Sequence, residues 1–356
     1  MTASSPMKVL LVEDSATVAA YVISILGSER DIQLLPVATT AAAGVRSAVA
    51  QRPDVVLMDM KLPDHDGIWA IEQIMAEAPC PIVVLSGYLN SRERDVTFES
   101  LRAGAVDVLA KPTGLDASQR ALFRNSLVNT VRVMSEAVVV RRNRSRQKLA
   151  PITTPTRESS TSLLPAHALT PIRYVLIGGS TGGPELLYRM LSALPAPFRL
   201  PILITQHTLE GFDDSLAQWL STTGHDVKLA KNGELPKAGT VRLAPADASI
   251  KVGYAGLSLV PSPKAATASM DSIDSMLSSA ARVWGDQCLA MVLTGMGRDG
   301  AAGMRTLCER GALTIAQSSQ TCVVASMPES ARAVNAIKYV LSPEEMLGVL
   351  RALAER

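Results

Sequence analysis

Short apolar runs rich in Val, Ile and Leu alternate along this 356-residue chain with longer segments whose apolar residues recur at helical spacing. This alternation predicts parallel β-sheets, because two parallel strands are joined by a crossover, usually a helix that covers one face of the sheet. The pattern occurs twice, on either side of a stretch that lacks it. The sequence therefore predicts an α/β chain with two doubly wound parallel-sheet domains joined by a linker.

The first domain is expected to span residues 1–140. Its predicted strands are the five β-branched apolar runs Lys8–Val12, Ile32–Val37, Asp54–Met58, Pro81–Leu85 and Ala105–Leu109. An amphipathic stretch, Ser118–Val140, is predicted to close the domain with a helix.

Residues 141–170 have a different composition. They open with a basic cluster at 141–148 and then become rich in Pro, Ser and Thr, which is typical of a linker. The basic cluster is expected either to be a solvated helix end or to contact an acidic surface or phosphate.

The second domain is expected to span residues 171–356. Its predicted strands are the runs Ile172–Ile177, Leu200–Thr205, Val227–Ala230, Leu289–Thr294, Leu313–Ala316 and Ile337–Val340. Between Ala230 and Pro261, shorter runs interrupted by Gly and Asn predict a β-rich insertion.

Charge and cysteine content restrict the environment and the partners. The 35 basic and 33 acidic residues give a net charge of +2, which argues against nucleic acid or an anionic membrane as the main partner. The four cysteines have neither the spacing of a zinc site nor the density of a disulfide framework. The sequence has no signal-peptide core and no apolar run that approaches the roughly 18 residues of a membrane span. A soluble cytoplasmic protein without direct membrane insertion is therefore expected.

Polar residues follow the predicted strands of the first domain. Glu13 and Asp14 follow the first strand, Asp59 the third, Ser86 the fourth and Lys111 the fifth. Because parallel strands end at one edge of the sheet, these side chains are expected to meet there. Carboxylates suit Mg²⁺, and a hydroxyl and an ammonium suit phosphoryl oxygens. Taken singly, each acidic residue is better explained as a helix cap or turn former, but the five matches at one edge favour a site.

These residues, together with Pro63, Asp66 and Gly67, resemble the receiver domain of two-component response regulators over residues 7–128. The resemblance implies a flavodoxin-like fold in which a histidine kinase phosphorylates Asp59. It further implies that Glu13, Asp14 and Asp59 bind Mg²⁺ and that Ser86 and Lys111 contact the phosphoryl group. One position departs from the family, because Val108 stands where an aromatic switch residue is usual.

The glycine-rich segment 178–184 follows the first predicted strand of the second domain. A phosphate cradle would need glycine where Ser180 stands, whereas a G-x-S-x-G nucleophile elbow fits. A serine needs a base, and His207 follows the next predicted strand, with Gln206 between them, at the same sheet edge. The imidazole in turn needs an orienting carboxylate, and Asp299 lies in the loop after the strand Leu289–Thr294. The alternatives are a glycine turn without chemistry, a structural histidine, and Asp299 as the N-cap of the next helix.

The order Ser, His, Asp along the chain differs from that of α/β-hydrolases. The segments 179–184, 206–207 and 293–300 instead resemble the chemotaxis protein-glutamate methylesterases, the CheB family, in which a receiver precedes the catalytic domain. The resemblance implies Ser180 as nucleophile, His207 as general base, Asp299 as its orienting residue, and an oxyanion hole with backbone N–H groups at Thr181 and Met296. No cofactor is implied for the ester chemistry.

The implied reaction is the hydrolysis of glutamyl methyl esters on methyl-accepting chemotaxis receptors, with deamidation of certain glutamines by the same route. The resemblance also implies that the resting receiver covers the active-site face and that phosphorylation exposes it. Thr208 and Leu209 stand where the family often has Met-Pro, which leaves open a divergent receptor or another methylated protein as substrate. A second hypothesis is a non-catalytic response regulator whose second domain binds a partner. A DNA-binding output domain fits poorly, because no basic recognition helix is predicted.

Overall fold

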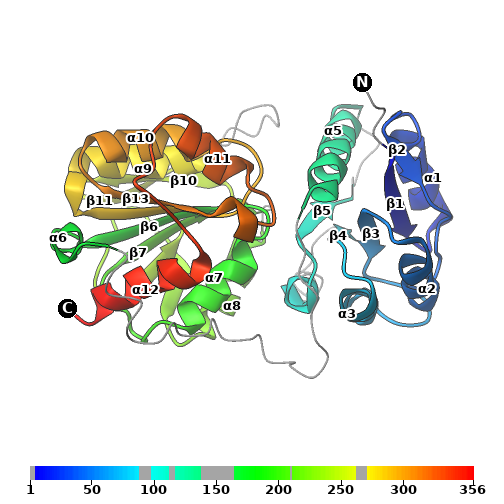
Figure 1. Cartoon of the computed structure of the whole chain (residues 1–356), viewed down its shortest axis with the longest axis horizontal. Coiled ribbons are helices and arrows are strands. Elements are labelled where there is room, and N and C mark those ends of the chain that lie inside the picture. The colour runs from blue at the N-terminus through cyan, green and yellow to red at the C-terminus, as the bar shows by residue number, and fades with distance from the viewer. Residues whose placement is uncertain (1–4, 88–97, 112–116, 138–163, 209–210, 262–270) are drawn as a thin grey trace. The chain divides into compact units, whose positions relative to one another are not determined.

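The computed structural model describes residues 5–87, 98–111, 117–137, 164–208, 211–261 and 271–356. The chain divides into two units, Met1–Gln147 and Lys148–Arg356. Each unit has its own parallel sheet with helices on both faces (Figure 1). The prediction of two α/β domains is therefore confirmed.

The first unit contains a five-stranded sheet in the order β2-β1-β3-β4-β5, and all of its strand pairs are parallel. The strands are β1 (Met7–Val12), β2 (Ile32–Leu34), β3 (Val55–Asp59), β4 (Ile82–Ser86) and β5 (Asp107–Ala110). The helices whose limits lie within the described residues are α1 (Ala16–Leu26), α2 (Ala41–Gln51), α3 (Gly67–Glu77) and α5 (Ala117–Ser135). Helix α1 packs with α5 and α2 packs with α3, so each pair covers part of the sheet. Because both faces are covered, β3 and β4 are buried along their whole length, which explains their continuous apolar sequence.

Two elements of the first unit are shorter than predicted. Strand β2 ends at Leu34 rather than Val37, because Pro36 has no N–H group to donate to the sheet. Helix α5 ends at Ser135, and the remainder of the stretch predicted to 140 lies largely outside the described residues.

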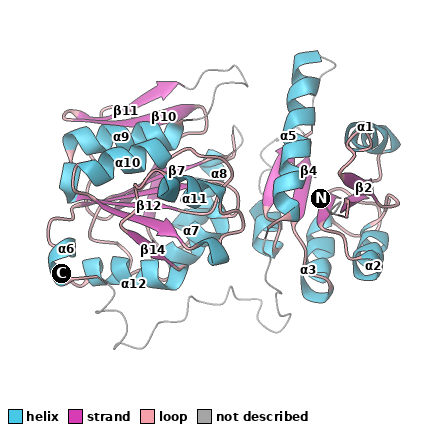
Figure 2. Ribbon diagram, turned by 45° about the horizontal axis from the view of Figure 1, so that its top comes forward, coloured by secondary structure: helices cyan, strands magenta, loops and turns pink. Residues whose placement is uncertain are grey.

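The second unit contains a seven-stranded sheet in the order β14-β13-β12-β6-β7-β9-β8, again with parallel pairs throughout. Its strands are β6 (Tyr174–Gly179), β7 (Ile202–Gln206), β8 (Asp226–Leu229), β9 (Thr240–Leu243), β12 (Cys288–Val292), β13 (Leu313–Gln317) and β14 (Tyr339–Leu341). The predicted β-rich insertion supplies β9 to this sheet. It also supplies a separate antiparallel hairpin of β10 (Ala248–Gly253) and β11 (Gly256–Pro261), visible above α9 in Figure 2.

The helices of the second unit are α6 (Ala166–Leu169), α7 (Gly183–Ser192), α8 (Asp213–Ser221), α9 (Ser272–Val283), α10 (Ala301–Glu309), α11 (Ser326–Ala333) and α12 (Pro343–Ala354). Helix α6 lies in the segment predicted as linker, and its last residue, Leu169, and the preceding Leu164 are buried. The last residues of that segment therefore belong to the second unit, while the basic cluster 141–148 lies outside the described residues. None of the described helices combines the length and apolar character that crossing a bilayer requires.

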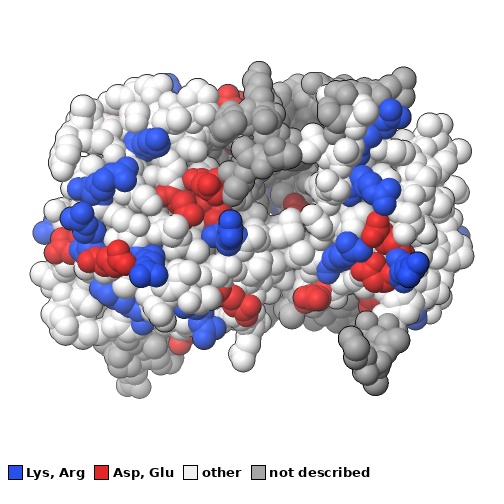
Figure 3. Space-filling model, turned by 90° about the horizontal axis from the view of Figure 1, so that it is seen from above, with Lys and Arg blue, Asp and Glu red and all other residues white. Residues whose placement is uncertain are grey.

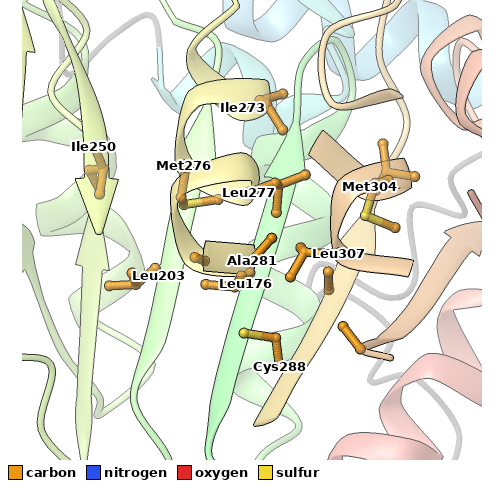
Figure 4. Close-up of a cluster of buried hydrophobic side chains, with 14 of the residues drawn as sticks. Leu176, Leu203, Ile250, Ile273, Met276, Leu277, Ala281, Cys288, Met304 and Leu307 are labelled. Atoms are coloured by element: carbon orange, nitrogen blue, oxygen red, sulfur yellow. The ribbon is translucent and has the colours of Figure 1, made fainter. Parts of the chain in front are cut away.

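A continuous apolar core joins the sheet of the second unit to α9 and α10 (Figure 4). Met276 and Leu277 of α9 and Met304 of α10 are fully buried in it. Two glycines permit the close approach of α9. A Cβ atom at Gly178 of β6 would lie 2.5 Å from the Ile273 side chain, and one at Gly303 of α10 would lie 2.6 Å from Leu277 Cβ. The start of α9 is thereby held against both β6 and α10.

Charged side chains of both signs occur together on one face of the structure. On the face drawn in Figure 3, Lys and Arg are interspersed with Asp and Glu, in agreement with the near-neutral net charge.

Met304→Ala tests the contribution of this core. Removing a fully buried methionine is expected to lower the free energy of unfolding of the second unit by about 2 to 5 kcal/mol, because transfer energy is lost and a cavity remains. Urea denaturation would be followed in a Trp69→Phe background, so that only Trp219 and Trp284 of the second unit report.

Arg305→Ala in the same helix is the matched control. It breaks only an exposed ion pair with Glu309, at 2.9 Å, and is expected to change stability by less than about 1 kcal/mol. Equal losses in the two variants would contradict the described packing of α10.

Candidate active site

The carboxyl ends of three adjacent strands lie side by side in the second unit. In the pairing of β6 with β7, Gly179 faces Gln206, and in the pairing of β6 with β12, Gly178 faces Val292. The order of the sheet reverses between β6 and β12, and ligand crevices of open α/β sheets lie at such reversals. Ser180 and His207 are the residues that directly follow the paired ends of β6 and β7.

Ser180 occupies a tight turn between β6 and α7, as the sequence predicted. Its N–H donates to the Thr294 carbonyl at 3.1 Å, and its carbonyl accepts from the Gly183 N–H at 2.8 Å. Gly182, with φ of +77°, is the N-cap of α7 and has the left-handed conformation that favours glycine. Gly295 approaches from the loop after β12 so closely that a Cβ atom there would lie 2.6 Å from Ser180 Cβ. The Ser180 turn is therefore held both by its own strand, β6, and by the loop that follows β12.

His207 and Asp299 form a short polar contact, with 2.7 Å between Nε2 and Oδ2. The His207 N–H continues the sheet by donating to the Gly179 carbonyl at 3.0 Å, which fixes its backbone beside Ser180. Asp299 engages Nε2, so Nδ1 is the ring nitrogen left for the serine. Within the described chain no hydrogen bond joins the Ser180 hydroxyl to this ring. Catalytic hydrogen bonds often tighten only when substrate binds.

The carboxylate of Asp299 also receives two backbone hydrogen bonds from the first turn of α9. Ile273 N–H donates to Oδ2 at 2.9 Å and Asp274 N–H donates to Oδ1 at 2.8 Å. Asp299 therefore caps α9, and the alternative that it caps its own helix is wrong, because Gly300 is the N-cap of α10. The two N–H groups and the imidazole together fix the orientation of the Asp299 carboxylate.

The residues expected to form an oxyanion hole lie on either side of Ser180. Thr181 is buried, and its carbonyl accepts from the Thr294 hydroxyl at 3.0 Å. Met296 is half-buried in the loop after β12. Among the described residues, the Met296 N–H has no hydrogen-bond acceptor, as an N–H that is to meet a developing oxyanion requires. The Ser180 N–H is already donated to the Thr294 carbonyl.

The other two histidines of the second unit, His167 and His225, have no contact with Ser180 among the hydrogen bonds of the described residues. His225 is buried, and its Nε2 lies 3.1 Å from the Leu191 carbonyl. Burial lowers the pKa of His225, which favours the neutral ring. His167 is exposed in α6.

A second polar site lies at the carboxyl ends of the strands of the first unit. Lys111 Nζ lies 2.7 Å from a Glu13 oxygen and 3.1 Å from an Asp59 oxygen. Burial raises the pKa of Glu13, and the hydrogen bond from Lys111 opposes that shift. Ser86 is buried at the end of β4, and its carbonyl accepts from the Lys111 N–H at 2.6 Å.

The acidic residues of this second site have the donor chemistry of a magnesium site. Glu13, Asp14 and Asp59 each present a carboxylate oxygen, and these oxygens lie within 4.8 Å of one another. Glu13 and Asp59 are buried, whereas Asp14 is exposed and open to a ligand. All-oxygen donors of this kind suit a hard divalent cation.

Comparison with known proteins identifies both units. A family model described as CheB methylesterase matches residues 175–350, and one described as response regulator receiver domain matches residues 9–122. A protein-glutamate methylesterase/protein-glutamine glutaminase of Nitrosospira multiformis is 37% identical over 352 residues, 98% of each chain. One from Syntrophus aciditrophicus is 35% identical over 349 residues, again 98% of each chain. The chain belongs to the CheB family.

Among solved structures, the catalytic domain of Thermotoga maritima CheB methylesterase is 35% identical, with a TM-score of 0.47. The match covers 51% of this chain and 98% of that one. Val108 stands where the resemblance to receiver domains implies an aromatic residue. Val108 is buried in β5, opposite Val84 of β4, and therefore forms part of the apolar core. Thr208 is half-buried after His207, whereas Leu209 lies outside the described residues.

Asp274 is a site residue to which the sequence analysis gave no role. Its Oδ1 accepts from the Gly303 N–H in the first turn of α10 at 2.6 Å, while Asp299, just before α10, caps α9. The first turns of α9 and α10 thus exchange carboxylate caps. The available signal is an aspartate at the third position of an amphipathic helix, but its partner lies 29 residues away.

The pKa of Asp274 predicts how the exchanged cap responds to pH. Burial raises this pKa, and the negative charges of Asp299 and Asp271 act in the same direction. The native state therefore binds this proton more tightly than the unfolded chain does, so ionisation of Asp274 lowers the free energy of unfolding as pH rises through the native pKa.

Asp274→Asn keeps an acceptor for the Gly303 N–H and removes the charge. We expect it to be at least as stable as the wild-type chain at neutral pH, with the advantage disappearing as pH falls and Asp274 becomes protonated. Asp274→Ala leaves the N–H of Gly303 without its cap and is expected to be about 1 kcal/mol less stable than the Asn variant. Urea denaturation across the acid range measures both, and equal stability of the two variants would exclude a capping role.

Proposed function

We propose that this chain is a phosphorylation-controlled esterase that hydrolyses γ-glutamyl methyl esters of methyl-accepting chemotaxis receptors and deamidates glutamines by the same route. The observation that carries this proposal is the His207–Asp299 pair beside Ser180 at adjacent strand ends, in a chain of the CheB family. The relatives are named for both activities, methylesterase and glutaminase.

In the proposed reaction, the Ser180 hydroxyl oxygen attacks the ester carbonyl carbon while Nδ1 of His207 takes its proton. Asp299 holds the ring and stabilises the imidazolium through Nε2. The backbone N–H groups at Thr181 and Met296 stabilise the oxyanion. The imidazolium then protonates the departing methoxide, so that methanol leaves an acyl-enzyme. Water, deprotonated by His207, releases the glutamate carboxylate and regenerates Ser180, and for a glutamine substrate the leaving group is ammonia.

For the receiver, we propose that Asp59 accepts a phosphoryl group from the chemotaxis histidine kinase. Glu13, Asp14 and Asp59 would hold Mg²⁺, which offsets negative charge on the phosphoryl oxygens. Lys111 already lies within 3.1 Å of Asp59 and is placed to pair with the phosphoryl group, and Ser86 ends the neighbouring strand. Without an aromatic residue at 108, the response is expected to pass through Ser86 and strand β5.

Ser180→Ala tests the catalytic assignment. It is expected to lower the rate of methanol release from methylated receptor membranes by at least about 10³-fold, because no other group forms the acyl-enzyme. Phosphorylation of Asp59 by a small-molecule phosphodonor is expected to be unchanged. Ser192→Ala is the control, at the exposed end of α7, the helix that follows the Ser180 turn. It should release methanol at the wild-type rate. Equal release by the Ser180 variant and the wild type would instead favour a non-catalytic response regulator.

Asp59→Asn tests the control by phosphorylation. We expect it to abolish the stimulation of methanol release by the phosphodonor, because an amide does not accept the phosphoryl group. Asp66→Asn is the matched control, in the loop between Asp59, the end of β3, and helix α3. Asp66 caps α3 by accepting from the Trp69 N–H at 2.8 Å, and asparagine caps equally well, so stimulation should persist. Stimulation that survives in the Asp59 variant would refute this residue as the acceptor.

A further inference from the structure

The side chain of Gln206 lies between the backbones of Ser180 and His207. Gln206 is the last residue of β7, is 4% exposed, and faces Gly179 across the sheet. Its Nε2 donates to the Ser180 carbonyl at 2.8 Å and to the His207 carbonyl at 3.0 Å. A primary amide carries two hydrogens on its nitrogen, and this one uses both to connect the two segments.

The position of the Ser180 turn is fixed from three directions. The Gly183 N–H donates to the Ser180 carbonyl from α7, and the Ser180 N–H donates to Thr294 in the loop after β12. The third contact is the hydrogen bond from Gln206. Of the three, only Gln206 also bonds to the carbonyl of His207.

The other end of the Gln206 amide argues against a purely structural role. Its Oε1 is buried and accepts no hydrogen bond from any described residue. It lies against Gly179 and Gly183, where a Cβ atom on either glycine would collide with it. A buried carbonyl without a donor is unfavourable, so packing alone would favour an apolar side chain of the same length. The unpaired carbonyl therefore destabilises the fold, and the two hydrogen bonds donated by the amide must compensate for it.

We propose that Gln206 is a positioning residue that sets the separation between the Ser180 hydroxyl and the His207 ring. This inference rests on the proposed esterase function. By holding both carbonyls, the amide limits how far the two segments move apart at the open end of the sheet. The Ser180 hydroxyl and Nδ1 of His207 then need only a small movement to form a hydrogen bond when substrate binds.

Gln206→Met tests this role, because it keeps the length of the side chain and removes both donors. In the phosphorylated full-length chain we expect kcat for methanol release to fall by about 10- to 100-fold, the loss typical of a displaced reacting group. KM should stay close to the wild-type value, since Gln206 is not expected to touch substrate. Wild-type kcat, or a change confined to KM, would overturn the proposal.

Thr314→Val is the matched control. It removes a partly buried hydrogen bond that the Thr314 hydroxyl accepts from the Lys338 N–H at 3.2 Å, near the opposite end of the sheet. Thermal unfolding of both variants measures the structural cost. A positioning role predicts that only the Gln206 variant loses kcat, even where the two unfolding temperatures fall equally. Parallel losses of kcat and stability in the two variants would overturn it.

A second readout separates this inference from the proposed function. A fluorophosphonate reacts with an activated serine: the serine oxygen bonds to phosphorus, fluoride leaves, and the serine proton passes to the imidazole. We expect Gln206→Met to slow labelling of Ser180 by a factor similar to its effect on kcat. A wild-type chain that is labelled but releases no methanol refutes the proposed substrate and leaves the positioning role supported. Equal labelling of the wild type and the variant, or no labelling of the wild type, refutes the positioning role.

Discussion

Parallel pairing of β12, β6 and β7 is the constraint on which the candidate active site depends. The pairing places Gly178 between Val292 and Thr205, so the three strands leave the sheet together. Each following residue or loop then supplies one part of the site. The same geometry operates in the first unit, where the ends of β1, β3 and β5 bring Glu13, Asp59 and Lys111 together. One rule of sheet architecture thus brings together the residues of both the proposed phosphoacceptor site and the proposed esterase site.

The two sites stabilise their buried carboxylates in different ways. In the first unit, the ammonium of Lys111 contacts the carboxylates of both Glu13 and Asp59, and in the proposed phosphorylation the same ammonium would also contact the phosphoryl group. In the second unit, Asp299 is held by two backbone N–H groups and an imidazole. Backbone N–H groups neither titrate nor change rotamer, so they hold the Asp299 carboxylate in one orientation. A site whose charge changes needs a mobile partner, whereas a site whose geometry must persist needs fixed donors.

Much of this architecture was predictable from sequence because it follows from local patterns. Alternating strands and helices predicted both sheets, and strand ends predicted that Ser180 and His207 share an edge. Long-range packing was not predictable. The cap that Asp299 gives to α9 depends on how α9 and α10 pack, whereas the sequence offered only the next helix as one for Asp299 to cap. Likewise, the Gln206-His207 motif was visible, but the contacts of the amide follow from strand register. Strand limits shifted by a few residues because hydrogen-bond pairing, rather than hydrophobicity, sets them.

Because α9 and α10 exchange caps, the orientation of Asp299, the proposed orienting carboxylate, depends on the packing of this helix pair. Asp299 is oriented by α9, α10 is completed by Asp274 of α9, and Gly303 allows the two helices to touch. A protein engineer who transplanted only the serine, histidine and aspartate onto another α/β scaffold would leave the aspartate free to rotate. The smallest transferable unit is instead the three strand ends together with both helices. Natural divergence of this enzyme is expected to keep these elements while the surrounding loops change.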